Sequence, residues 1–317
     1  MPKIALNPKS KLRYISLGFL GSLVVLSYAV ALFFKPTAHH SAPDIASQTP
    51  KTSHVMPLGS RFAMGLPAPR KEMAFVEMET STEMCQAFDQ CGFELSKVAS
   101  GEDSVPRIYL TKLPGDLKGL PPKHKRDAFI KSILPLVLEV NEEIRADREK
   151  LLALQGRIEK GGHLRSQDRT WLRYVASEYK SKSHDIKVLL KHVDEIPPSL
   201  ALSQAIIESG WGTSKAAKDK NSTFGHMASH SKVKSFKSLH HGVKSYAGNL
   251  NRHPAYKGFR EARAKMRKSE GKICGHKLAS HLIKYSVRGA AYTKELQNLI
   301  NRLELHHFDA AHVRLKP

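Results

Sequence analysis

The sequence is poor in cysteine, which excludes two kinds of scaffold. Only three cysteines, Cys85, Cys91 and Cys274, occur among 317 residues, so disulfides cannot form the framework of the fold. Their spacing also lacks the CxxC pairs of a structural zinc site. The 17 histidines include no HExxH pattern. We therefore expect neither a metal ion nor another cofactor.

Acidic residues are scarce beside basic ones. The chain has 29 Asp and Glu against 51 Lys and Arg, a formal net charge of +22. With 41% hydrophobic and 25% charged residues, it can bury a core, which excludes both a disordered polyelectrolyte and a membrane-embedded bundle. A chain this basic suggests a polyanionic partner, and nucleic acid is the first candidate.

Long hydrophobic runs are absent except for one near the amino terminus. Residues 14–34 contain no charge and match the roughly 20 residues that cross a bilayer. The basic leader, residues 1–13, should stay in the cytoplasm, which sends the remainder across the membrane. We predict an uncleaved anchor, with cleavage after Ala29-Val30-Ala31 as the alternative. Residues 35–69, rich in Pro, Ser, Thr and Ala, read as a flexible tether.

This placement changes the meaning of the positive charge. We expect a single-pass protein of the inner membrane with a periplasmic body, where nucleic acid is scarce, so a nucleic-acid partner is not expected. An oxidising compartment also permits a disulfide between Cys85 and Cys91, a possibility that the sequence leaves open.

The body is predicted to be mainly α. Hydrophobic periodicity predicts a helix over 123–154, with a kink or break at Pro135. We expect an N-terminal helical extension over 70–160 and a second domain over 161–317, with one small β-hairpin insertion between 224 and 240. Helical signals cover residues 166–179, 185–193, 199–209, 214–218, 241–252, 254–268, 276–285 and 291–305, and residues 105–110 are expected to be extended.

Glu208 is the candidate catalytic residue because it is the only charge between residues 199 and 212. Burial raises the pKa of a carboxyl group, and a carboxyl that stays protonated near neutrality can act as a general acid. Gln204 lies one helical turn earlier and could orient it. Gly210 should end the helix, and Trp211 offers a flat apolar surface. The alternative is that Glu208 caps a neighbouring helix or pairs with Lys or Arg.

An ordered set of motifs resembles glycoside hydrolase family 73, the glucosaminidases of bacterial cell walls. The order of the upstream motifs is similar to the Bax-type subgroup, and the match extends from about residue 105 to 305. The matching segments are SQAIIESGWGTSKAA at 203–217, Asn221, Phe224-Gly225, residues 243–246 and 249–256, Tyr285-Ser286, Gly289 and Tyr292, and upstream residues 105–111, 131–137 and 141–144.

The resemblance implies a lysozyme-like α+β fold whose catalytic domain covers residues 161–317. It implies hydrolysis of the β-1,4 bond between N-acetylglucosamine and N-acetylmuramic acid in peptidoglycan. Glu208 would protonate the departing oxygen, and Tyr285 would stand at the cleft. Trp211, Phe224 and Tyr246 would line the path of the sugar strand. The alternative for these aromatic residues is ordinary core packing.

Two departures from the family pattern concern the reaction. Most glycosidases need a second carboxylate, yet Asp219 is the only acid between residues 209 and 260. The acetamido group of the substrate could assist, Asp219 or Glu261 could move in, or activity could be weak. The usual Asn-Asn-Leu-Phe-Gly also appears here as residues 221–225, Asn-Ser-Thr-Phe-Gly.

Two further functions stay open beside the hydrolase. A lytic transglycosylase uses one glutamate as acid and base, and a non-catalytic wall-binding protein could keep the fold without activity. Peptidoglycan also fits the charge pattern, because ten Lys and Arg face one acid between residues 209 and 260. The predicted partners are thus anionic glycan strands and, through the N-terminal segment, the cell membrane.

Overall fold

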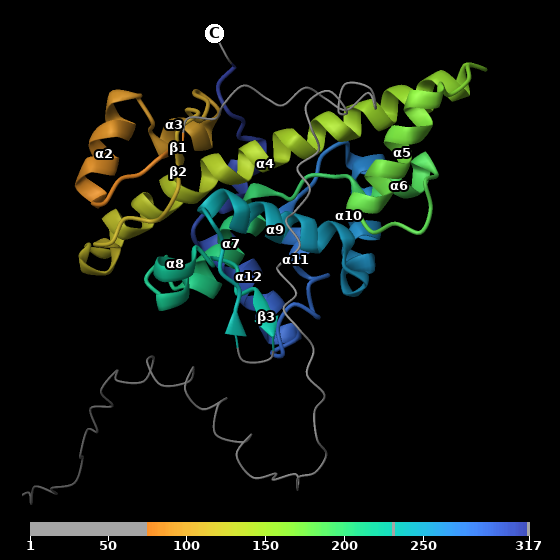
Figure 1. The fold of residues 1–317 in the computed structure, drawn as a ribbon. Coiled ribbons are helices and arrows are strands. Elements are labelled where there is room, and N and C mark those ends of the chain that lie inside the picture. Colours follow the sequence, from red (N-terminus) through yellow and green to blue (C-terminus); the bar gives the residue numbers. More distant parts are fainter. Residues whose placement is uncertain (1–74, 230–231, 316–317) are drawn as a thin grey trace, which may run out of the picture. The chain divides into compact units, whose positions relative to one another are not determined.

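The computed structural model describes residues 75–229 and 232–315, here called the described unit (Figure 1). The predicted leader, membrane anchor and tether, residues 1–69, lie outside the described residues. Within the described ranges no helix is both long and apolar enough to span a bilayer. The described unit is mainly helical, as predicted, with two small two-stranded sheets.

The longest element is α4, Pro122–Glu159, which extends across the whole described unit. Figure 1 shows α2 beside one part of α4 and α5 and α6 near its other end. Of the kink or break predicted at Pro135, the break is wrong, because α4 runs through this proline without interruption. Residues 132–141 are all buried, so tertiary packing holds the helix together although the proline lacks an N–H group.

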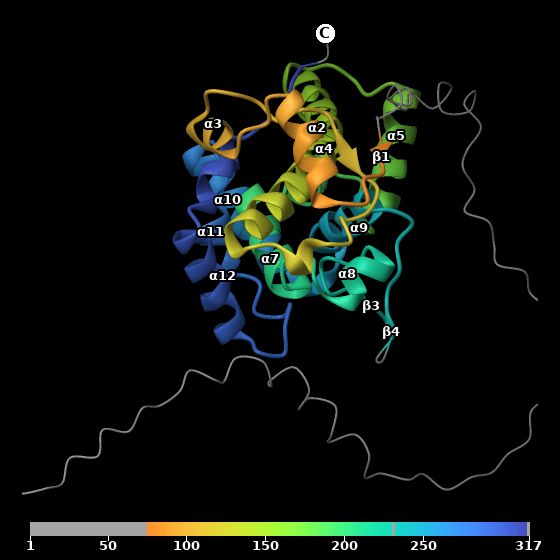
Figure 2. The same cartoon turned by 90° about the vertical axis from the view of Figure 1, so that its left-hand side faces the viewer.

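The remaining helices follow most of the predicted ranges, and Figure 2 shows α10, α11 and α12 together on one side of the unit. Asp185 and Ser214 cap α6 and α8, since each side chain accepts a hydrogen bond from a backbone N–H in the first helical turn. The helices other than α4 and α7 are α2 (Ser81–Gln90), α3 (Leu95–Ser100), α5 (Ser166–Glu178), α6 (Ile186–His192), α8 (Lys215–Lys220), α9 (Leu239–Arg252), α10 (Lys257–Glu270), α11 (Gly275–Ala279) and α12 (Ala290–Arg302), with 3-10 turns η2 (Leu117–Gly119), η3 (Pro254–Tyr256) and η4 (Leu305–Ala310).

Both sheets are short. Strands β1, Phe75–Val76, and β2, Tyr109–Leu110, pair in parallel. Strands β3, Met227–Ser229, and β4, Lys232–Val233, form the antiparallel hairpin predicted between residues 224 and 240. This hairpin follows α8 directly in the chain.

Helix α7, Pro198–Ser209, lies at the centre of the unit and contacts α4, α11, α12 and η4. Residues 198–206 are all buried, which explains why this stretch carries no charge before Glu208. Pro198 occupies the first helical position, where its missing N–H is not needed. Gly210 ends the helix with φ of 57°, in the left-handed region. The end of this central helix is where Glu208 stands.

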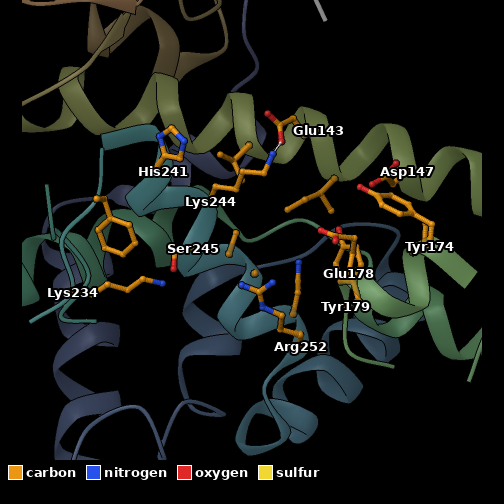
Figure 3. Close-up of a pocket in the computed structure, with 17 residues that line it drawn as sticks. Glu143, Asp147, Tyr174, Glu178, Tyr179, Lys234, His241, Lys244, Ser245 and Arg252 are labelled. Carbon is orange, nitrogen blue, oxygen red and sulfur yellow. Dashed lines mark hydrogen bonds and ion pairs between the residues drawn. The ribbon is translucent and has the colours of Figure 1, made fainter. Parts of the chain in front are cut away.

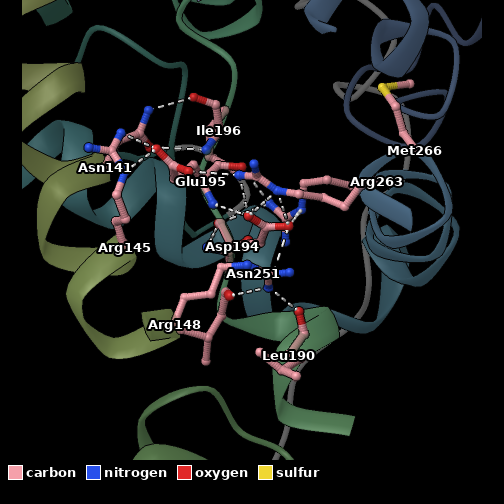
Figure 4. Close-up of polar contacts among 12 residues, drawn as sticks. Asn141, Arg145, Arg148, Leu190, Asp194, Glu195, Ile196, Asn251, Arg263 and Met266 are labelled. Carbon is pink, nitrogen blue, oxygen red and sulfur yellow. Dashed lines mark hydrogen bonds and ion pairs between the residues drawn. The ribbon is translucent and has the colours of Figure 1, made fainter. Parts of the chain in front are cut away.

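A buried ionic network fixes the turn that leads into α7 (Figure 4). Asp194 is 1% exposed and accepts a 2.7 Å hydrogen bond from Arg267 of α10, and the Arg263 guanidinium lies within 3.7 Å. Asn141 of α4 holds the same turn by exchanging two hydrogen bonds with the backbone of Ile196. Asn251 of α9 donates to the carbonyl of Asp194. Three helices thus set the direction in which α7 begins.

Two further local expectations differ from the structure. The helix expected over 276–285 ends earlier, because α11 stops at Ala279 and a series of turns follows. The possible disulfide between Cys85 and Cys91 is not formed, and both residues, like Cys274, are free thiols.

Candidate active site

The carboxyl group of Glu208 is half-buried at the end of α7. Tyr292 of α12 donates a hydrogen bond of 2.8 Å from its hydroxyl to Glu208 Oε1. The two residues are 84 positions apart in the chain, so α12 must pack along α7 to bring them together.

A chain of hydrogen bonds fixes the direction in which Tyr292 donates. The hydroxyl of Tyr246 on α9 donates to Gln204 Oε1 over 2.8 Å, and Gln204 Nε2 donates to the Tyr292 oxygen over 3.1 Å. Because Tyr292 receives this bond, its single hydroxyl proton points to Glu208. Gln204 is fully buried. It was predicted to orient Glu208, and in the structure it reaches Glu208 through Tyr292.

The second carboxyl oxygen of Glu208 faces the backbone of Gly225. A Cβ atom at position 225 would stand 2.5 Å from Glu208 Oε2, and Gly225 has φ of +64°. Both the close approach and the left-handed backbone require glycine here. The Phe-Gly turn before the hairpin therefore closes against the carboxyl group.

Two pairs of stacked rings surround this group. Tyr285 stacks on Tyr292 with ring centroids 5.7 Å apart and planes 2° apart. Phe224 stacks on Tyr246 with centroids 4.0 Å apart and planes 13° apart. The Tyr285 hydroxyl donates to the Phe224 carbonyl over 2.8 Å, which ties the two pairs together. The side chains of Phe224 and Tyr246 are buried, whereas Tyr285 is half-buried.

A cleft of about 510 Å³ opens beside these residues. Gly225 and Tyr285, which contact Glu208 and Tyr292, both line it. Its other walls come from the hairpin, α9 and η3. The charged side chains on these walls are Lys180, Lys234 and Arg252, and no Asp or Glu is found among the described lining residues.

Burial raises the pKa of Glu208. The hydrogen bond from Tyr292 and the positive charge of Arg288 lower it, and the negative charge of Glu295 raises it. The balance lies above the ordinary value of a glutamate, as expected for a carboxyl group withdrawn from water. Arg288 and Glu295 form an ion pair of 2.7 Å with each other.

Other predicted residues lie in different surroundings. Trp211 is half-buried and packs edge-on against Phe129 of α4, with centroids 5.9 Å apart. Asp219 is exposed and pairs with Lys215 on α8, and Glu261 pairs with Lys257 on α10. In the described ranges no group of His, Cys, Asp and Glu is arranged to hold a metal ion.

Comparison with known proteins places the chain in a family. Residues 185–305 match the glucosaminidase family model, described as mannosyl-glycoprotein endo-beta-N-acetylglucosaminidase. Protein bax of Escherichia coli strain K12 is 33% identical over 219 residues, which cover 64% of this chain and 76% of that protein. The chain belongs to this Bax-type glucosaminidase family. No solved structure matches the chain, so the lysozyme-like part of the predicted fold stays a prediction.

The family match covers every residue of the Glu208 network. The range 185–305 contains Gln204, Glu208, Tyr246, Tyr285 and Tyr292. It supports a glycoside hydrolase type of enzyme related to peptidoglycan.

Sequence reasoning did not assign a role to Tyr292, Arg288 or Glu295. Tyr292 appeared only as part of the family motif. The sequence did indicate that Tyr292 and Glu295 share one face of a helix, because they lie one helical turn apart on α12. It could not show that this face of α12 packs against Glu208.

Proposed function

We propose that the protein is a peptidoglycan hydrolase of the endo-β-N-acetylglucosaminidase type, with Glu208 as general acid. The observation that carries this proposal is the environment of the carboxyl group. It is withdrawn from water, it accepts a directed hydrogen bond on Oε1, and its Oε2 faces Gly225 at a cleft. Since Oε1 is an acceptor, the acidic proton resides on Oε2, the oxygen on the Gly225 side.

In the first step, the Glu208 proton passes to the glycosidic oxygen as the bond between this oxygen and C1 of N-acetylglucosamine breaks. No second carboxylate lines the described part of the cleft. The carbonyl oxygen of the substrate's acetamido group therefore forms the new bond to C1, as in glycosidases with substrate assistance. Water then adds to C1 as the bond between the acetamido oxygen and C1 breaks, and Glu208 regains a proton from that water.

The buried residues around Glu208 act by positioning in this scheme. Gln204 and Tyr246 hold the Tyr292 hydroxyl in its donating direction. Tyr285 lines the cleft directly and contacts the sugar strand. Phe224 also lines the cleft, and the buried Tyr246 supports it through the stacked rings. Trp211, packed on Phe129, supports the turn after α7.

A lytic transglycosylase is the second candidate, because the same cleft with a single carboxyl group suits an enzyme in which one glutamate serves as acid and base. Product analysis separates the two. The full-length protein is incubated with purified peptidoglycan, and the new ends are identified by mass spectrometry. The proposal predicts N-acetylglucosamine at the new reducing ends. Anhydro-muramoyl ends would identify a transglycosylase, and reducing N-acetylmuramic acid would identify a muramidase.

The proposed place of action is the periplasmic side of the inner membrane. The support is the uncharged run of residues 14–34 behind a basic leader. A topology reporter fused after Lys35 should be active outside the cytoplasm. A reporter active only in the cytoplasm would contradict this location.

A further inference from the structure

A second hollow of about 470 Å³ lies on the α9 side of the cleft. Lys234, Ser245 and Arg252 line both hollows, so the two are neighbours, and together they are here called the groove. Helix α9 provides the shared floor. The walls of the second hollow, here called the distal pocket, come from α4, α5 and the segment after the hairpin.

The two parts of the groove differ in their charged side chains. The part beside Glu208 has Lys180, Lys234 and Arg252 on its walls. The distal pocket shares Lys234 and Arg252, and it adds Lys244 together with three carboxylates, Glu143, Asp147 and Glu178. Figure 3 shows Lys234 and Ser245 at one end of the pocket, Asp147, Tyr174, Glu178 and Tyr179 at the other, and Arg252 between them.

The carboxylates of the distal pocket differ in whether a cationic side chain is already paired with them. Glu143 is paired with Lys244 and lies 3.6 Å from His240; although burial opposes ionisation, these partners lower its pKa to about 2. The exposed carboxylate of Glu178 forms no ion pair within the described part of the chain. A cation that enters this end would therefore meet Glu178 beside the aromatic rings of Tyr174 and Tyr179.

A ligand that fits this groove carries anionic groups near the reaction centre and a cationic group farther away. The stem peptide on each N-acetylmuramic acid has this arrangement, because it carries carboxylates and ends its side chain in the primary amine of a diamino acid. We propose that the distal pocket binds the stem peptide of the strand held in the cleft. Arg252 and Lys234 contact its carboxylates, and Glu178 contacts its ammonium group. This assignment rests on the proposed peptidoglycan substrate.

The assignment has a consequence for substrate choice. Cross-linking converts the amine of the diamino acid into an amide, which removes the positive charge. The distal pocket then loses its ion pair, so the protein favours strands whose stem peptides are not cross-linked.

The test is calorimetric binding of a synthetic stem peptide to the full-length protein. One peptide carries the free side-chain amine, and the other is acetylated at this amine. Acetylation should weaken binding about fivefold, the size expected for one solvent-accessible ion pair. Glu178→Gln should weaken binding of the free-amine peptide by the same factor and leave the acetylated peptide unaffected. Glu102→Gln, in the exposed turn after α3, is the matched control and should bind both peptides like the wild type.

Equal binding of both peptides by the wild type would overturn the inference. So would an equal loss for both peptides in Glu178→Gln, because a merely structural effect does not depend on the amine. The measurement needs no turnover, so it is separable from the proposed activity. If the protein distinguishes the two peptides but does not cleave peptidoglycan, the distal pocket is supported and the proposed hydrolase is contradicted. If it cleaves peptidoglycan but binds both peptides equally, the hydrolase is supported and the distal pocket is contradicted.

Discussion

Tyr292 is the only side chain with a direct hydrogen bond to Glu208 in the described structure. This bond lowers the pKa of Glu208, against the larger effect of burial. In Tyr292→Phe the pKa should rise, so the alkaline limb of the pH–rate profile, where Glu208 loses its proton, should move to higher pH. The rate at the optimum should fall about tenfold, the effect of one lost hydrogen bond on positioning.

Tyr285→Phe is the matched control for this change. Its hydroxyl bonds the Phe224 carbonyl and not Glu208, so removing it should leave the alkaline limb in place. An unshifted profile in Tyr292→Phe, or an equal shift in both variants, would show that Tyr292 does not set the ionisation of the acid.

Arg288 and Glu295 offer a second test at the residue scale. Their effects on the pKa of Glu208 are smaller than those of burial and of the Tyr292 hydrogen bond. Arg288 lowers this pKa and Glu295 raises it. Arg288→Gln should move the alkaline limb to higher pH, and Glu295→Gln should move it to lower pH. Initial rates measured across pH check both signs. Shifts in the same direction would contradict the electrostatic account.

At the scale of elements, the turn before the hairpin must come close to the end of α7. Gly225→Ala introduces a Cβ atom 2.5 Å from Glu208 Oε2 and places a side chain at φ of +64°. The unfolding free energy should fall by about 1–2 kcal/mol from the backbone alone. Activity should fall at least about tenfold, because the carboxyl group is displaced from its productive position.

Gly101→Ala is the control that separates the loss of stability due to backbone strain from the loss of activity due to displacement of Glu208. Gly101 has φ of +80°, and an added Cβ atom there meets nothing within 4 Å. This variant should lose similar stability and keep full activity. Thermal unfolding and initial rates of both variants decide the matter, and an active Gly225→Ala protein would count against the contact with Glu208.

Helix boundaries with a local chemical signal were predictable from the sequence. Gly210 was predicted to end α7 and does so, and the predicted ranges 185–193 and 214–218 begin at Asp185 and Ser214, which are the N-caps of α6 and α8. The sequence left a kink and a break at Pro135 as alternatives and could not decide between them, because burial of this stretch by other helices outweighs the local cost. Glu208, in contrast, could be singled out from the sequence, because it is the lone charge in an apolar helix. Its partner Tyr292 depends on how α12 packs on α7, which residue spacing does not reveal.

At the scale of the whole molecule, the ionic network around Asp194 joins α4, α9 and α10 at the start of α7. Burial alone would raise the pKa of Asp194, but Arg263 and Arg267 outweigh it and lower the pKa. The stabilisation is thus present above the unfolded pKa of about 4 and is lost as pH falls below it.

Asp194→Asn should lower the unfolding free energy at pH 7 by about 3 kcal/mol, because it leaves buried guanidinium groups without their counter-charge. The difference from the wild type should shrink below about pH 4. Urea unfolding at both pH values measures this. Asp219→Asn, which breaks an exposed pair, is the control and should unfold like the wild type. A pH-independent loss would contradict the ionic role of Asp194.

Part of the chain's excess positive charge lies on the walls of the cleft. The described walls of the cleft beside Glu208 carry Lys180, Lys234 and Arg252 and no carboxylate, so the local potential favours an anionic strand. This local excess was visible in the sequence as a stretch with many basic residues and one acid. The carboxylates of the distal pocket were not, because Asp147 and Glu178 come from α4 and α5, far earlier in the chain.

The most direct test of the central claim is the activity of Glu208→Gln on purified peptidoglycan, followed through the new reducing ends. The change keeps the shape of the side chain and removes the acidic proton, so the rate should fall at least about 100-fold. Glu261→Gln, an exposed glutamate paired with Lys257 on α10, should keep the wild-type rate and the N-acetylglucosamine ends. Wild-type activity in Glu208→Gln would contradict the account.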